Sequence, residues 1–95
     1  MKVYEGGRSL AGATVTVDGK PLDPRFDVKT FAPAGFEWTY EGDGPMQLAL
    51  ALLADHLGDA QKALAQAEPF MRGFVANLDN SWRITSADIE AALRG

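Results

Sequence analysis

Few side chains in this chain could perform metal or thiol chemistry. His56 is the single histidine, and the absence of cysteine excludes disulfides, thiol catalysis and thiolate metal sites. A metal site would have to combine His56 with Asp55 and Asp59. Asp55 points well away from His56 on a helical wheel, and there is no second histidine. We therefore expect no metal and no cofactor.

Nucleophilic and acid–base chemistry also lack a recognisable arrangement. No serine lies in the sharp strand-to-helix turn that exposes a nucleophile to a base such as His56. Glu37 and Glu41 share one face of a predicted strand, but nothing in the sequence indicates environments that would separate their pKa values. We expect the protein not to be an enzyme. The alternative is a small enzyme or ligand-binding domain that uses His56 and Glu37.

Acidic residues gather in the middle of the chain. No Lys or Arg occurs between Lys29 and Lys62, whereas five acids fall there: Glu37, Glu41, Asp43, Asp55 and Asp59. A solvated surface explains this run, and so does an acidic patch that binds a basic partner. In the second case, the partner-binding residues are Glu37, Glu41 and Asp43.

An aromatic segment and an apolar helix are the predicted centre of the fold. Three aromatic residues alternate with polar ones over residues 36–40, which predicts a half-buried strand. Gly42-Asp43-Gly44-Pro45 then forms a turn, with Gly44 as the expected N-cap and Pro45 in the first helical position. This acidic turn, which lacks one amide at Pro45, is a poor phosphate site.

The helix after this turn is unusually apolar. Its five leucines, from Leu48 to Leu57, spread over roughly 200° of the surface, so we expect a helix covered on more than one side. Gly58 is expected to end it in a left-handed conformation. The single histidine falls within its apolar arc.

Shorter patterns predict the other elements. Asp18-Gly19 predicts a tight hairpin turn, Asp59 a helix cap, and Thr85-x-x-Asp88 a capping box. Strands are predicted over residues 2–5, 13–18, 20–22, 26–30, 36–40 and 82–84, and further helices over 60–67, 69–78 and from 86. This order predicts an α+β fold: a small, mainly antiparallel β-sheet with a central apolar helix and two or three further helices packed on one face.

Composition limits the remaining possibilities. Ninety-five residues make one domain, 1–95, and a hydrophobic content of 46% supports a folded core. The net charge of −4 argues against direct nucleic-acid binding, which needs a basic face. No apolar run has signal-peptide or membrane-spanning length, so we expect a cytoplasmic protein.

Residues 35–50 resemble the signature of a small bacterial and phage family that is known only as a domain of unknown function. Weaker similarity covers Tyr4, Gly6 and Arg8 at one end and residues 82–93 at the other. The family has small residues where this chain has Thr39, Glu41 and Asp43. The matching positions are Gly35, Phe36, Glu37, Trp38, Tyr40, Gly42, Gly44, Pro45, Gln47, Leu48, Ala49 and Leu50.

The resemblance implies a similar fold and a non-enzymatic accessory protein that binds a protein partner. It also implies an association with phage or other mobile DNA, and an inhibitor of a host defence complex is one form that this could take. A structural subunit of an oligomer is a further alternative.

Overall fold

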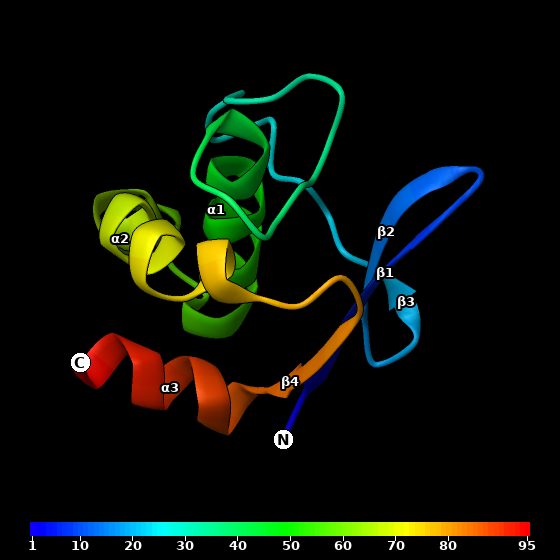
Figure 1. The fold of residues 1–95 in the computed structure, drawn as a ribbon. Coiled ribbons are helices and arrows are strands. Elements are labelled where there is room, and N and C mark those ends of the chain that lie inside the picture. Colours follow the sequence, from blue (N-terminus) through cyan, green and yellow to red (C-terminus); the bar gives the residue numbers. More distant parts are fainter.

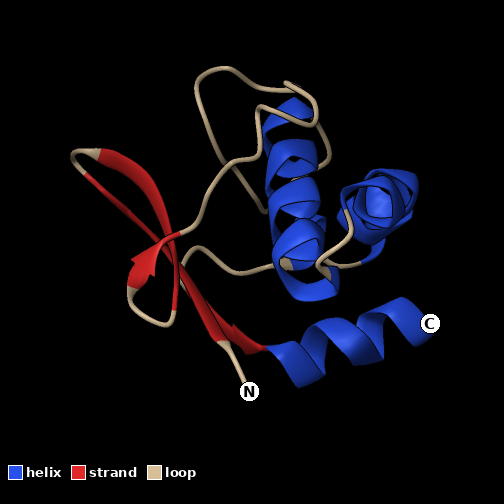
Figure 2. Ribbon diagram, turned by 180° about the vertical axis from the view of Figure 1, so that it is seen from behind, coloured by secondary structure: helices blue, strands red, loops and turns tan.

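A four-stranded antiparallel sheet lies beside three α-helices in the computed structural model, which describes residues 1–95 (Figure 1). The strand order is β3-β2-β1-β4, and the helices lie on one side of the sheet (Figure 2). The predicted α+β fold is confirmed. The elements are β1 (Val3–Ser9), β2 (Gly12–Val17), β3 (Lys20–Pro21), α1 (Asp43–Leu57), α2 (Ala60–Gly73), the short 3-10 helix η1 (Val75–Asn77), β4 (Trp82–Thr85) and α3 (Ser86–Arg94).

The predicted hairpin turn is present. Asp18 and Gly19 have φ angles of 50° and 82°, the positive values that a tight turn of this kind needs. The prediction that β1 ends at Glu5 is wrong, because the strand continues through two glycines. Trp82 lies directly over Gly6, where a Cβ atom would come within 2.2 Å of the indole ring. Glycine at this position leaves space for the Trp82 ring to lie against the backbone of β1.

Helix α1 is the buried centre of the molecule. Every residue from Gln47 to Ala54 is buried, as the spread of leucines predicted. The helix begins two residues earlier than expected, at Asp43, with Gly42 as the N-cap in place of Gly44. Gly58 ends it in the predicted left-handed conformation, with a φ of 66°.

The predicted strand over residues 36–40 does not form. Trp38 is fully buried, whereas Tyr40 is half exposed, so the aromatic residues do not share one face. Thr39 has a φ of 80°, and this left-handed residue interrupts the pleat that the alternation predicted. The predicted strand over 26–30 is also wrong; the segment consists of turns that pack against α1.

Helix α2 is continuous where two helices were predicted. Pro69 lies inside it, although proline cannot donate to the carbonyl of Ala65 four residues earlier. Ala65 is exposed, so water can satisfy that carbonyl and the helix continues to Gly73. The two local caps are as predicted: Asp59 accepts from the amides of Gln61 and Lys62, and Thr85 forms a capping box with Asp88. No helix is both long and apolar enough to cross a bilayer.

Candidate functional site

Glu37 is held by Arg8 of β1. The guanidinium Nη2 lies 2.8 Å from Glu37 Oε1 and also donates to the backbone oxygen of Trp38 at 3.0 Å. The same guanidinium lies over the Trp38 ring, 4.4 Å from its centroid. Gly44 lies against Glu37, since a Cβ atom there would approach Glu37 Cβ to 2.7 Å. Glu37 therefore anchors the loop before α1 to the sheet.

The two tryptophans form the interior of this anchor. Trp38 and Trp82 meet edge to face, with ring centroids 5.7 Å apart and planes at 89°. Trp38 Nε1 donates to the backbone oxygen of Asn80 at 3.1 Å. Both rings are buried, so they cannot serve as an exposed platform for stacking ligands.

Glu41 and Asp43 border a shallow hollow of about 410 Å³ beside the start of α1. Arg72 of α2 lies at the same hollow, 3.7 Å from Glu41 Oε1 and 2.8 Å from Glu68 Oε2. Two of the three acids predicted to bind a partner therefore have cationic neighbours, and Asp43 has none. The structure does not test their role in binding, which stays a prediction.

His56 joins α1 to α3. Its Nε2 lies 2.6 Å from Glu90 Oε2, and this hydrogen bond lowers the pKa of the Glu90 carboxyl. Asp55 turns elsewhere and accepts from the Tyr4 hydroxyl at 2.6 Å and from Lys2 Nζ at 3.1 Å. Burial, assisted by Asp55, raises the pKa of Tyr4 well above its usual value.

These contacts do not assemble a reaction centre. His56 and Glu37 have different partners, on α3 and β1, and neither residue lines the hollow beside the start of α1. No group of three acidic or histidine side chains is placed to hold a metal ion.

Gln47 is a structural residue within the apolar central helix. It is completely buried, and its side chain makes four hydrogen bonds to the backbone of the preceding loop. Oε1 accepts from the amides of Phe31 and Ala32 at 2.7 and 3.1 Å, and Nε2 donates to the carbonyls of Pro24 and Lys29 at 2.7 and 3.1 Å. The feature of the sequence that could have indicated this structural role is a single amide side chain among leucines.

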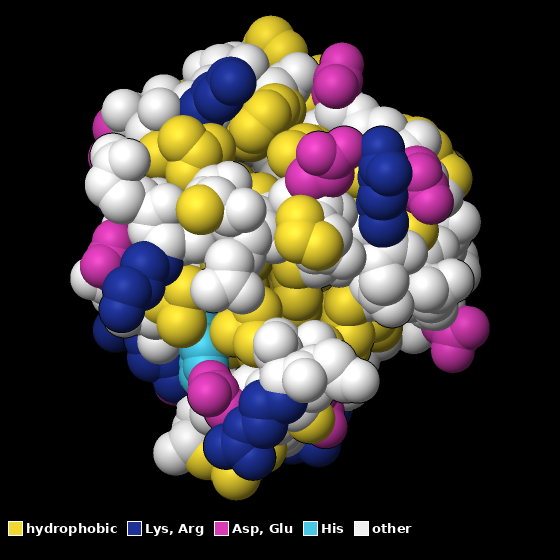
Figure 3. All heavy atoms as spheres, turned by 90° about the vertical axis from the view of Figure 1, so that its left-hand side faces the viewer, with side chains coloured by type: hydrophobic (Ala, Val, Ile, Leu, Met, Phe, Trp, Pro, Cys, Tyr) yellow, Lys and Arg dark blue, Asp and Glu magenta, His cyan; other side chains and the backbone are white.

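An open apolar groove lies between α2 and α3 and has a volume of about 840 Å³. Figure 3 views this side of the molecule and shows hydrophobic side chains exposed in a hollow. We call this feature the α2–α3 groove. It is lined by Gln66, Pro69, Phe70, Gly73, Phe74, Leu78, Ile84, Asp88, Ala91, Ala92, Leu93 and Gly95.

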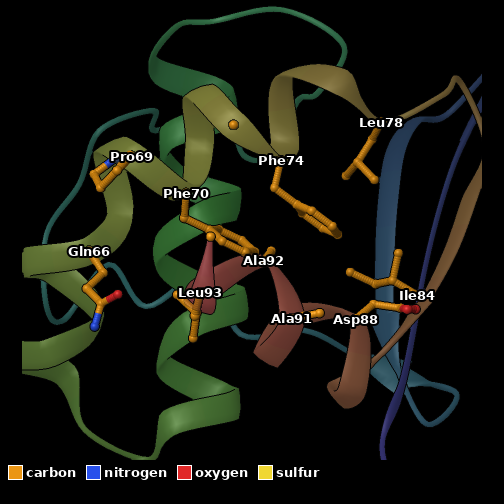
Figure 4. A pocket seen from close by; sticks show the side chains of 12 residues that line it. Gln66, Pro69, Phe70, Phe74, Leu78, Ile84, Asp88, Ala91, Ala92 and Leu93 are labelled. Atoms are coloured by element: carbon orange, nitrogen blue, oxygen red, sulfur yellow. The ribbon is translucent and has the colours of Figure 1, made fainter.

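Two phenylalanines form the centre of the groove. Phe70 lies in α2 and Phe74 directly follows it; their rings are stacked, with centroids 5.0 Å apart, and both project into the space between α2, α3 and β4 (Figure 4). Phe70 is buried, whereas Phe74 and Ala92 are only partly buried. The sequence predicted a helix over residues 69–78, but it could not indicate that the chain leaves Phe74 partly uncovered.

Comparison with known proteins identifies one family. A family model described as "Family of unknown function (DUF6166)" matches residues 4–95. No protein with a curated description and no solved structure matches the chain.

Proposed function

The chain belongs to this family of unknown function, and we propose that it is a non-enzymatic accessory domain that binds a protein partner through the α2–α3 groove. The observation that supports this function is the apolar lining of an open groove. Binding sites are typically concave and lined mainly by hydrophobic and aromatic side chains.

The composition of the groove supports a binding role over a catalytic one. Aliphatic and aromatic side chains dominate its lining, and Asp88 is its only charged side chain. A reaction centre would need polar groups that converge on one point. Burial of apolar surface is instead the main source of affinity in protein–protein association.

Gly73 offers a direct test. It lines the groove, and a Cβ atom added there meets nothing within 4 Å, so Gly73→Leu introduces a bulky side chain at the groove from a position where the backbone has room for a Cβ. We expect wild-type protein to retain a stoichiometric partner from host lysate and Gly73→Leu to lose it. Ala65→Leu adds the same side chain at an exposed position of α2 outside the groove and should retain the partner. Equal retention by all three proteins would reject the groove as the binding site.

The acidic residues at the start of α1 suggest a second contact for the same partner. Glu41 and Asp43 lie together at the smaller hollow, and Asp43 has no ion pair within the chain. Asp43→Lys reverses one exposed charge at the first turn of the helix, and we expect it to weaken binding of a basic partner. Unchanged affinity after this reversal would remove the acidic residues from the interface.

The biological setting is a proposal that rests on the family resemblance alone. An accessory protein of phage or mobile DNA, such as an inhibitor of a host defence complex, would act by occupying a host protein. Identification of the retained partner tests this proposal, since a housekeeping protein unrelated to defence would contradict it.

A further inference from the structure

We infer that the occupant of the α2–α3 groove is an amphipathic helix of another protein, with a stripe of apolar side chains and a basic side chain that meets Asp88. This inference rests on the proposed function and adds the shape and charge of the partner segment.

The walls of the groove favour a helix as the occupant. Most of the lining comes from α2 on one side and α3 on the other, with Leu78 and Ile84 closing one end (Figure 4). Neighbouring helices pack by placing the side-chain ridges of one in the grooves of another. A third helix laid between α2 and α3 would cover Phe74 and Leu93, the partly buried apolar side chains that the chain leaves uncovered.

Gly73 supports close approach of such a helix. It is the last residue of α2, its φ is not left-handed, and the space above it is empty. Neither backbone conformation nor packing within the chain therefore requires glycine here. A glycine and small side chains allow another helix to approach closely. Ala91 and Ala92 are the small side chains on the α3 wall of the groove.

Asp88 sets the preferred charge of the partner. Its Oδ2 accepts from the Thr85 amide at 2.8 Å and from the Thr85 hydroxyl at 3.2 Å, whereas its Oδ1 has no partner in the chain. Asp88 is exposed and is the only charged side chain in the lining. A lysine or arginine beside the partner's apolar stripe would pair with this carboxylate, and an acidic residue there would be repelled.

Two synthetic helical peptides test the inference. Each is about 18 residues long, so that it can form a stable helix when stapled, and carries a leucine–alanine stripe. One has lysines along the edges of the stripe, and the other has glutamates at the same positions. Binding to the full chain is followed by the amide chemical shifts of ¹⁵N-labelled protein.

We expect the lysine peptide to shift amides of α2 and α3 and to bind roughly threefold to tenfold more tightly than the glutamate peptide, a range expected for one exposed ion pair replaced by repulsion. Asp88→Asn keeps an oxygen that can cap α3 but removes the charge, so it should abolish this preference. Gly73→Leu, and Ala91→Leu from the opposite wall, should abolish binding of the lysine peptide.

Other results would overturn the inference. Equal affinity of both peptides rejects the role of Asp88, and shifts confined to other elements reject the groove as the helix site. If neither peptide binds while Gly73→Leu still loses the lysate partner, the proposed function stands and the helical occupant is wrong. Concentration-dependent self-association that Gly73→Leu abolishes would make a second copy of the chain the occupant and would likewise reject a foreign helix.

Discussion

The two sides of helix α2 show how one chain closes one interface and leaves another open. Toward α1, Ala63 and Ala67 are completely buried against a helix that carries long leucines. Toward α3, Phe74 remains only partly buried and faces a groove of about 840 Å³. Two helices pack closely when small side chains on one face large side chains on the other, because the large ones fill the space between them.

The difference lies in what the opposite helix provides. Ile89 is the only buried residue of α3, and the alanines beside it are too short to fill the space below Phe70 and Phe74. The pair of His56 and Glu90 ties α3 to α1 without closing the groove. Helix α3 is therefore positioned by a few contacts, whereas residues 47–54 of α1 are enclosed on all sides.

We expect the largest effect from a substitution in the enclosed helix α1. Gln47→Leu leaves two backbone amides and two carbonyls of the preceding loop without partners, which should lower the free energy of unfolding by about 4 kcal/mol. Urea unfolding followed by circular dichroism measures the change. Gln61→Leu, at an exposed position of α2, should change it by less than about 0.5 kcal/mol. Similar small changes in both variants would show that water replaces the Gln47 contacts.

A pair of leucine truncations compares the two sides directly. Leu52→Ala, in the buried part of α1, should cost about 3 kcal/mol because it leaves a cavity. Leu93→Ala, at the groove, should cost less than about 1 kcal/mol because the side chain is partly in water already. Urea unfolding of both variants gives the comparison, and equal losses would mean that the groove side is packed as tightly as the core.

The same change at two glycines should have opposite signs. Gly6→Ala forces a Cβ atom into the Trp82 ring and should cost about 1–3 kcal/mol. Gly73→Ala meets empty space in a helical conformation and should stabilise the chain by up to about 0.5 kcal/mol. Thermal unfolding reports both changes. A destabilised Gly73→Ala would contradict the absence of any structural need for glycine at the groove.

The smallest effect concerns the attachment of α3 and depends on pH. The hydrogen bond to His56 lowers the pKa of Glu90 below its ordinary value of 4.5. A carboxyl with a lowered folded-state pKa contributes stability above its ordinary pKa, and this contribution is lost as the pH falls through the folded-state pKa. Wild type should therefore have a higher melting temperature than Glu90→Gln near neutral pH. The difference between the two melting temperatures should shrink in acid.

Thermal unfolding at a series of pH values measures that gap. Glu5→Gln changes an exposed carboxylate without an ion pair, and its gap to wild type should stay nearly constant. A gap for Glu90→Gln that does not narrow in acid would show that the bond to His56 does not contribute to stability.

Sequence patterns correctly predicted the features that form through interactions between neighbouring residues. The hairpin turn at Asp18-Gly19, the cap at Asp59 and the capping box at Thr85 each depend on a few adjacent residues. The same patterns failed over residues 26–40, where alternation predicted two strands. That region has no strand partner and is held instead by Arg8 and Gln47, which are distant in the sequence.

The candidate site was likewise predictable only where its features depend on neighbouring residues. The acids Glu37, Glu41 and Asp43 were visible as a local run of charge, but the cationic neighbours of Glu37 and Glu41 come from β1 and α2. The groove was not predictable, because periodicity shows that a helix face is apolar without showing what covers it.

By itself, the sequence determined the α+β class, the apolar central helix, its glycine end and the caps of the later helices, because these depend on side-chain periodicity and on hydrogen bonds between near neighbours. Only the tertiary structure decided that Trp82 lies on Gly6, that Gln47 replaces a strand partner, that His56 meets Glu90, and that α2 has one covered and one open side. These features depend on which distant segments meet and on the volume that their side chains fill.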